Sequence, residues 1–179
     1  MRAFVSVNVE DLGLIREIMK IAEFIKDGEK GISLTKEQNM HFTLKFLGEI
    51  DDSTRDELIN SLSSIKFNRF TIRLRGIGVF PSPDRIRVIW IGSDSQDLVR
   101  LAREVDRASA SIPSDEEFTP HLTIARVKFV ENKRALLERI EARRNVDLGT
   151  YSVESFYLMK SDLHPNGPIY TPVKKFQLL

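Results

Sequence analysis

The sequence of 179 residues contains no cysteine, only three histidines and a single tryptophan. Without cysteine the chain cannot form a disulfide, use a thiolate nucleophile or bind zinc through sulfur. It also lacks any apolar run of about 18 residues, the length that a membrane-spanning helix requires. We therefore expect a cytoplasmic protein that has no membrane partner.

Neither sign of charge is in large excess, because 27 Lys and Arg side chains face 26 Asp and Glu side chains. This balance argues against wholesale electrostatic wrapping of nucleic acid, although a local basic patch would still attract a polyanion. Arginines do concentrate in the middle of the chain, at Arg69, Arg73, Arg75, Arg85 and Arg87. They either follow an RNA backbone or belong to a solvated strand face.

Two of the three histidines lie in the same pattern, His-x-Thr-apolar, at His41–Leu44 and His121–Ile124. The two copies are 80 positions apart. In a strand, residues i and i+2 point to the same face, so each copy places an imidazole beside a hydroxyl. The third histidine, His164, lies in a turn-like segment without a threonine partner, and we expect it on the surface.

Apolar periodicity and capping residues predict alternating strands and helices. The predicted strands are Arg2–Val9, Met40–Leu47, Phe70–Val79, Ile86–Ile91, Thr119–Phe129, Tyr151–Met159 and Ile169–Phe176. The predicted helices follow Asp11, span Asp51–Ile65, run from Leu98 to Ala108 and span Glu131–Arg143. Loops are expected at Pro81–Asp84, Pro113–Asp115 and Asp162–Gly167.

A shift of 80 positions overlays these elements, so the chain reads as a duplicated strand–helix–strand–helix–strand unit. We expect a single bilobal domain over residues 1–179, with repeat halves of approximately 1–80 and 81–179. The fold class is α+β, with antiparallel-rich sheets facing a central cleft and helices outside. A pseudo-twofold axis would bring the two His-x-Thr strands together in that cleft.

Two opposed histidines suit the cleavage of a cyclic phosphodiester. In-line attack needs a base on the water and an acid on the leaving oxygen, and imidazole serves either role near neutral pH. Thr43 and Thr123 would donate hydrogen bonds to the non-bridging oxygens. A lone His on a strand is more often structural, but two copies in a tandem repeat favour catalysis. No third ligand lies near either histidine in the pattern, so we expect no metal and no cofactor.

The two motifs and their flanks resemble the two-histidine (2H) phosphoesterase superfamily, and within it the RNA 2′,3′-cyclic phosphodiesterases, also called 2′-5′ RNA ligases. The resembling stretches are Arg2–Val7, Met40–Glu49, Arg87–Gly92, Phe118–Arg126 and Tyr170–Pro172. The resemblance implies a two-lobed α+β hydrolase that opens a terminal 2′,3′-cyclic phosphate to a 2′-phosphate. Run in reverse with an RNA 5′-hydroxyl, the same chemistry makes a 2′-5′ bond.

The resemblance also implies roles for single residues. His41 would be the proton donor to the leaving O3′ and His121 the proton acceptor from water, although the sequence itself leaves these two roles open. The implied partners are RNA ends that carry the cyclic phosphate, such as tRNA fragments, with no obligate protein partner. Alternatives are a phosphodiesterase of small cyclic phosphates, such as a nucleotide or an ADP-ribose derivative, and a non-catalytic RNA-end-binding protein.

Two further positions match the family, Phe46 for the terminal base and Arg126 for the phosphate. Both follow their histidine by five residues. Strict strand alternation puts that position on the face opposite the histidine, which predicts Phe46 in the core. A role in binding then requires a bulge or an earlier end of the strand. Arg126 is better placed, because a buried unpaired Arg is costly and its long fork can reach a phosphate.

Overall fold

The computed structural model describes residues 1–114 and 117–179, so Asp115 of the predicted loop after Pro113 lies outside the described residues. Within them, the helices are α1 (Leu12–Lys26), α2 (Asp52–Ser63), α3 (Gln96–Ala108) and α4 (Lys133–Ala142), with a short 3-10 helix at Glu37–Asn39. The strands are β1 (Arg2–Asn8), β2 (Ile32–Leu34), β3 (His41–Glu49), β4 (Phe70–Arg75), β5 (Ile77–Ser82), β6 (Arg85–Gly92), β7 (His121–Val127), β8 (Asp147–Val153), β9 (Ser155–His164) and β10 (Gly167–Gln177).

Each helix begins where a polar side chain caps it. Asp11, Asp51, Ser95 and Asn132 accept a hydrogen bond from the main-chain N–H three residues later. Such caps satisfy N–H groups that have no partner within the helix. The predicted helices are therefore confirmed to within a few residues at their ends.

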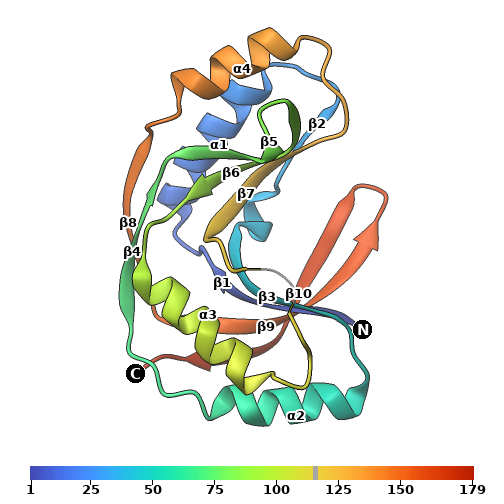
Figure 1. The fold of residues 1–179 in the computed structure, drawn as a ribbon, viewed down its shortest axis with the longest axis vertical. Helices are drawn as coiled ribbons and strands as arrows, with labels where there is room; N and C mark the ends of the chain where they lie inside the picture. The colour runs from blue at the N-terminus through green and yellow to red at the C-terminus, as the bar shows by residue number, and fades with distance from the viewer. Residues whose placement is uncertain (115–116) are drawn as a thin grey trace.

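One large antiparallel sheet runs through the molecule in the order β10-β9-β1-β3-β7-β6-β5, and β2 also pairs with β7. β3 and β7 lie at its centre. The second sheet is a ribbon of β4 and β8, which runs along one side of the molecule from one pair of helices to the other (Figure 1). The predicted α+β class is confirmed.

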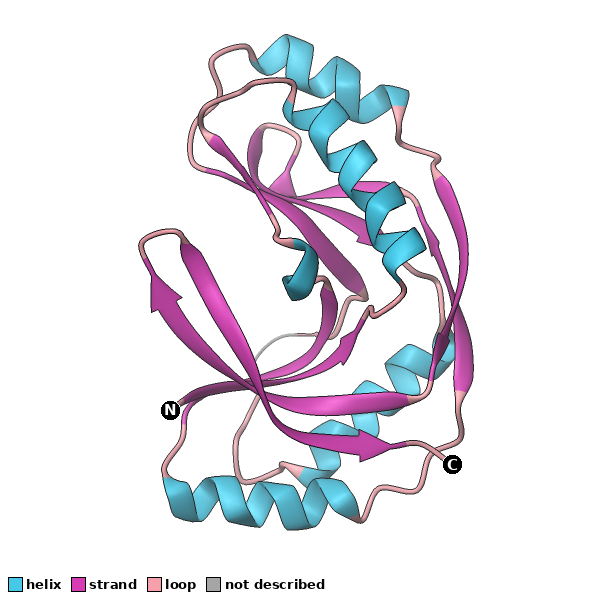
Figure 2. Cartoon of the chain, turned by 180° about the vertical axis from the view of Figure 1, so that it is seen from behind, coloured by secondary structure: helices cyan, strands magenta, loops and turns pink. Residues whose placement is uncertain are grey.

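The helices lie on the outer side of the bent sheet, in two layers at opposite ends of the molecule (Figures 1 and 2). One layer holds α1 and α4, which contact each other, and α1 packs against β7. The other holds α2 and α3, and α3 packs against β3. Each repeat half therefore places its first helix on the central strand of the other half. The buried side chains between helices and sheet form one continuous core.

Two predicted strands are wrong, because each is divided between the two sheets. The segment Phe70–Val79 breaks at Gly76, whose φ of +81° needs glycine, and separates β4 from β5. The segment Tyr151–Met159 breaks at Glu154 and separates β8 from β9. Both breaks occur where the chain leaves the β4–β8 ribbon and enters the main sheet.

The loop predicted at Asp162–Gly167 is also wrong. β9 and β10 continue through this segment as a hairpin that closes with a turn at Pro165 and Asn166. Gly167 follows the turn with a φ of +106°, which the absence of a side chain permits. The hairpin projects from the sheet beside the open side of the molecule (Figure 2), and the predicted surface position of His164 is confirmed near its tip.

Candidate active site

The two His-x-Thr motifs meet at the centre of the main sheet, where Phe42 of β3 pairs with Leu122 of β7. In this antiparallel register, His41 lies across from Thr123, and Thr43 lies across from His121. Phe42 and Leu122 are fully buried, whereas the four motif side chains are partly exposed. His41, Thr43, His121 and Thr123 thus share the face of the sheet opposite the helices, which we call the inner face.

Each imidazole is held through its Nδ1 atom. Nδ1 of His41 lies 2.6 Å from the main-chain oxygen of Asn39, and Nδ1 of His121 lies 2.7 Å from that of Thr119. A carbonyl oxygen only accepts, so Nδ1 carries the proton in both rings. In the neutral ring Nε2 is then free to accept a proton. Asn39 and Thr119 each precede their histidine by two residues, so the repeat duplicates the tether as well as the motif.

His41 is the more shielded of the two histidines. Its Nε2 lies 3.0 Å from Oγ1 of Thr43, which donates to it when the ring is neutral. Burial lowers the pKa of His41 from 6.5 to about 4, with smaller lowering by the charges of Arg126 and His121 and an opposing effect of the Asn39 carbonyl. His41 is therefore neutral at pH 7 unless an anion lies near it.

Aromatic rings surround both histidines. The His41 ring centroid lies 5.1 Å from that of Phe4 and 5.3 Å from that of Tyr170, with the Tyr170 ring nearly perpendicular. The His121 centroid lies 5.0 Å from that of Phe80, also nearly perpendicular, and 6.4 Å from that of Trp90. Such rings restrict imidazole rotation and offer flat apolar surfaces beside the Nε2 atoms.

A β-bulge in each central strand reverses the expected side-chain alternation. Opposite β3, Val5 pairs with Lys45 and Ser6 with Thr43, so Leu44 is an extra residue. Opposite β7, Ile89 pairs with Ala125 and Trp90 with Thr123, so Ile124 is the extra residue. Beyond each bulge, positions that would have faced the helices face the inner side.

The bulges correct the prediction for Phe46. Its side chain is 60% exposed and lies on the inner face with His41, not in the core as strict alternation predicted. Arg126 is exposed on the inner face with His121, and its charge reaches His41. The structure therefore places all six predicted site residues on one face of the sheet.

This arrangement can bind an anion and move protons on both sides of it. Two imidazole nitrogens, two hydroxyls and one guanidinium converge from the central strands. Among the described residues, no three His, Asp or Glu side chains are grouped as metal ligands would be. In the described part of the chain, no helix has the length and apolar character to cross a membrane.

Sequence reasoning missed the residues that hold the histidines in place. Asn39 and Thr119 act through their carbonyls, and the only sequence signal is their equal spacing before each motif. Phe4, Phe80 and Tyr170 come from other strands of the main sheet, two of them not adjacent to β3 or β7, so their approach depends on how the whole sheet is ordered and bent. Trp90 stood out as the sole tryptophan, but nothing in the sequence places it beside His121.

Comparison with protein families gives two consecutive matches to LigT-like phosphoesterases, at residues 12–90 and 91–170. Together they cover most of the chain, once for each repeat half. Among curated proteins, the chain is 40% identical over 178 residues to an RNA 2′,3′-cyclic phosphodiesterase of Methanocaldococcus jannaschii, covering 98% of this chain and 100% of that protein. A protein of the same name from Aquifex aeolicus is 38% identical over 177 residues, covering 91% and 92%.

Solved structures show the same fold. A Thermus thermophilus crystal structure superposes with a TM-score of 0.84 at 27% identity, covering 99% of this chain and 97% of that chain. The crystal structure of Escherichia coli LigT without ligand superposes with a TM-score of 0.76 at 23% identity, covering 99% and 96%.

Proposed function

The chain belongs to the family of LigT-like phosphoesterases and is a phosphodiesterase, and from this premise we propose that it opens RNA 2′,3′-cyclic phosphate ends to 2′-phosphomonoesters without a metal. The observation that carries the proposal is the pair of imidazoles on adjacent strands, each with Nδ1 held by a carbonyl and Nε2 left to exchange a proton. A protein that only binds RNA ends has no need of two such groups.

In the proposed reaction, the cyclic phosphate lies between the two histidines on the inner face. Nε2 of His121 removes a proton from water, which attacks phosphorus, and Nε2 of His41 gives a proton to O3′ as the P–O3′ bond breaks. The hydroxyls of Thr43 and Thr123 donate to the non-bridging oxygens, where negative charge is concentrated. Arg126 adds positive charge beside the phosphate, and Phe46 offers a ring on which the terminal base stacks.

The low pKa of His41 sets a condition on this assignment. A proton donor must be charged before the reaction, yet His41 is neutral at pH 7 in the free protein. The phosphodiester anion removes this obstacle, because a negative charge close to the ring favours imidazolium. Thr43 then turns its hydroxyl from His41 to the phosphate. Binding of substrate and protonation of His41 are thus coupled, and the reverse reaction with an RNA 5′-hydroxyl would form a 2′-5′ bond.

The proposal is tested with an oligoribonucleotide that ends in a 2′,3′-cyclic phosphate. We expect a 2′-phosphate as the sole product, identified by ³¹P NMR, and faster turnover than with a 2′,3′-cyclic mononucleotide. A 3′-phosphate product, or no turnover of either substrate, would contradict the proposed reaction. Turnover of the mononucleotide alone would indicate an enzyme of small cyclic phosphates.

Chelation tests the metal-independent part separately. Excess EDTA should leave the rate unchanged, because imidazoles and hydroxyls perform every proposed step. If activity disappears with EDTA and returns with a divalent cation, the phosphodiesterase assignment stands, but the two-histidine mechanism is wrong.

A further inference from the structure

The β9–β10 hairpin contacts His41 through Asn39. The side-chain Nδ2 of Asn39 donates to the main-chain oxygen of Pro168 on β10, at 3.1 Å. The main-chain oxygen of the same residue accepts from Nδ1 of His41, at 2.6 Å. Asn39 is 94% buried, with 6% of its surface exposed, so loss of either bond would leave a polar group without water. One residue therefore joins the hairpin to the imidazole.

Tyr170, two residues beyond Pro168, makes the second contact. Its ring lies edge-on to His41, with a centroid distance of 5.3 Å and an interplanar angle of 86°. The same ring packs against Phe4 at 4.9 Å, which fixes its position. The hairpin thus limits both the rotation of the His41 ring and its access to water.

The repeat-equivalent histidine is held differently. Thr119 supplies the carbonyl for His121, but its side chain is exposed, and the nearest ring contact comes from Phe80 on the β5–β6 hairpin. The β9–β10 hairpin therefore contacts only one of the two histidines that share the His-x-Thr pattern.

We propose that Asn39 and Tyr170 are positioning residues through which the β9–β10 hairpin holds His41 in one orientation and one tautomer. The effect of this positioning on catalysis rests on the proposed function, in which a His41 ring held in one orientation protonates the leaving oxygen. The positioning itself concerns the free protein and is tested there without RNA.

The test is the NMR titration of the histidine rings with ¹⁵N-labelled protein. In Asn39→Ala the tether to Pro168 is lost, although the main-chain carbonyl remains. We expect the Nδ1–H tautomer of His41 to lose population, because the carbonyl that accepts from Nδ1 is no longer held in place. Thr119→Ala is the matched control at the equivalent position, and it should leave the His41 titration as in the unaltered protein.

Two Tyr170 variants make the test independent of the folding of Asn39→Ala. Tyr170→Leu removes the ring and should raise the His41 midpoint, because water then reaches the imidazole, whereas Tyr170→Phe keeps the ring and should retain the original midpoint. On a cyclic phosphate, Asn39→Ala should lower kcat about tenfold, the worth of roughly one hydrogen bond, with little change in KM. An unchanged His41 midpoint and tautomer in both Asn39→Ala and Tyr170→Leu would overturn the proposal.

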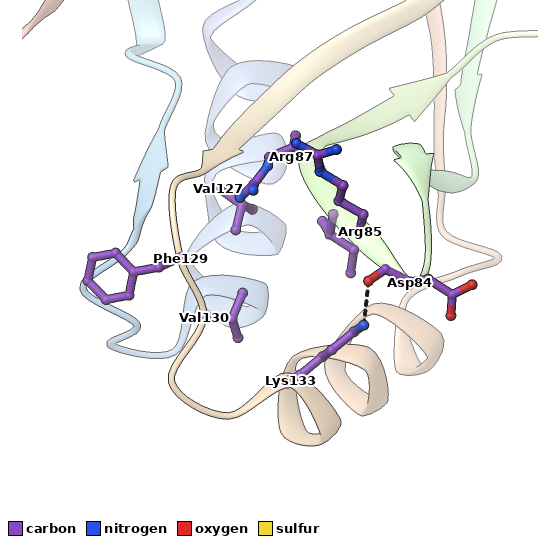
Figure 3. Close-up of a pocket in the computed structure, with 8 residues that line it drawn as sticks. Asp84, Arg85, Arg87, Val127, Phe129, Val130 and Lys133 are labelled. Atoms are coloured by element: carbon purple, nitrogen blue, oxygen red, sulfur yellow. Dashed lines mark hydrogen bonds between the residues drawn. The ribbon is translucent and has the colours of Figure 1, made fainter.

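A second surface carries an inference that does not depend on the first. It lies where β6 begins and β7 ends, far from His121. His121 pairs with Gly92 at one end of these strands, and Arg126 pairs with Val88 nearer the other. Just past Arg126, where the strand end meets α4 on the helix-covered side of the sheet, lies a groove of about 190 Å³ whose lining includes the apolar residues Ile86 and Val127 (Figure 3). Its distance from His121 is about 20 Å along the strand.

Three cations line this groove: Arg85, Arg87 and Lys133. Arg87 donates to the main-chain oxygen of Lys128 at 3.1 Å, and Lys133 donates to that of Asp84 at 2.5 Å (Figure 3). These carbonyl oxygens orient the Arg87 and Lys133 side chains but do not neutralise their positive charge. Within the described part of the chain, none of the three forms an ion pair.

The other arginines of the central cluster behave differently. Arg73 and Arg75 pair with Asp147 and Asp94 at 2.7 Å, and Arg69 lies 3.7 Å from Glu154. The structure therefore divides the cluster into paired arginines and the unpaired Arg85 and Arg87. Phe129, which is 50% exposed, borders the groove, but its ring points away from these cations toward Gly31 (Figure 3).

We infer that this groove binds the single-stranded RNA that precedes the reacting end, with phosphates on the three cations and a base over the apolar residues between them. Cations that follow the backbone are a usual means of binding single strands. The inference rests on the proposed function, because the reacting phosphate must lie between the two histidines for the strand to run along β6 and β7.

The test compares two double variants that remove the same charge. Arg87→Ala with Lys133→Ala alters the groove, and Arg16→Ala with Lys20→Ala alters the exposed side of α1. Binding of a labelled oligoribonucleotide with a terminal 2′-phosphate is measured by fluorescence anisotropy over a range of salt concentrations. The groove variant should bind at least tenfold more weakly at low salt, with a salt dependence smaller by ~0.7 for each cation removed.

The control should retain the affinity and the salt dependence of the unaltered protein, and both variants should keep the rate on a cyclic mononucleotide. Equal affinities of the two variants for the oligonucleotide would overturn the inference that the groove binds RNA. Mononucleotide turnover in the same preparations shows whether the proposed function itself holds, so the two failures are distinguishable.

Discussion

At the scale of the residue, His41 and His121 lie in different surroundings although both belong to a His-x-Thr-apolar motif. Both rings are tethered at Nδ1 by the carbonyl two residues before them. Tyr170 and Phe4 enclose the first ring, whereas Phe80 and Trp90 lie beside the second. Each motif thus comes with its own carbonyl partner for Nδ1, and long-range packing determines which aromatic rings lie beside each imidazole.

The low pKa of His41 should make stability depend on pH. The unfolded chain protonates this ring near pH 6.5, whereas the folded chain does so only near pH 4. Between these values the unfolded state binds more protons, so the free energy of unfolding falls as pH falls through this window. We expect a loss of at most about 3 kcal/mol, since each pKa unit is worth ~1.4 kcal/mol. Urea unfolding from pH 4 to pH 7 would measure it.

His41→Asn is the control for that measurement, because it removes the titrating group with little change in volume. The variant should lose this part of the pH dependence. A variant with the same pH dependence as the unaltered protein would assign the effect to another group.

Replacement of either histidine should remove most of the activity. His41→Ala and His121→Ala should each lower kcat by ~10²–10⁴, the usual worth of one positioned proton-transfer group. The double variant should lose less than the product of the single losses, because the two groups act on one transition state. Single-turnover rates with a cyclic phosphate, compared at equal folded fraction by circular dichroism, provide the measurement. Near-normal turnover by one single variant would remove that histidine from the mechanism.

At the scale of the element, helices were predictable from the sequence because their signals are local. Asp11, Asp51 and Asn132 cap helices where polar residues precede apolar periodicity. Strand breaks and bulges depend instead on partners. In the sequence, Gly76 looks like a tolerated glycine within one strand. In the structure it separates β4 from β5, which lie in different sheets. The extra residues Leu44 and Ile124 carry no composition signal, so the inner-face position of Phe46 could not be derived from alternation.

Close packing of β5 on β6 leads to a prediction at Gly78. A Cβ atom built there would overlap the six-membered ring of Trp90, the indole that lies beside His121. Gly78→Ala should therefore lower the free energy of unfolding by about 1–3 kcal/mol, as overpacked sites do. It should also move the His121 ring signals in NMR spectra. Adding Trp90→Leu should recover part of the lost stability, and if it recovers none, the indole is not the source of the clash.

At the scale of the whole molecule, the two repeat halves are interlocked. α1 of the first half packs on β7, and α3 of the second half packs on β3. The duplication was readable from the repeated motif and the element order, but this exchange was not, because it depends on which sheet face each helix covers. The exchange joins both histidine strands to one continuous core.

The interlocking predicts that neither half folds alone. Fragments 1–83 and 84–179, divided at the turn between β5 and β6, should each lack dispersed tertiary NMR signals. Mixed together, they should regain helical circular dichroism and some turnover, since each completes the other's helix layer. If one fragment folds cooperatively by itself, its core does not need the helix that the other half supplies.

Because both repeat halves supply the same His-x-Thr motif, the motif does not assign the proposed acid and base, and their roles must be separated by chemistry. A phosphodiester that expels p-nitrophenolate needs little protonation of its leaving oxygen. If His41 is the acid, the loss caused by His41→Ala should shrink at least tenfold on this substrate, within the ~10²–10⁴ range of proton transfer. His121→Ala should stay severely impaired, because water must still be activated. The opposite result would exchange the roles, and equal losses on both substrates would indicate that the imidazoles act mainly through charge. Competition with a 2′,3′-cyclic nucleotide first establishes that the ester binds between the two histidines, where each half of the molecule would supply one proton-transfer group in the proposed mechanism.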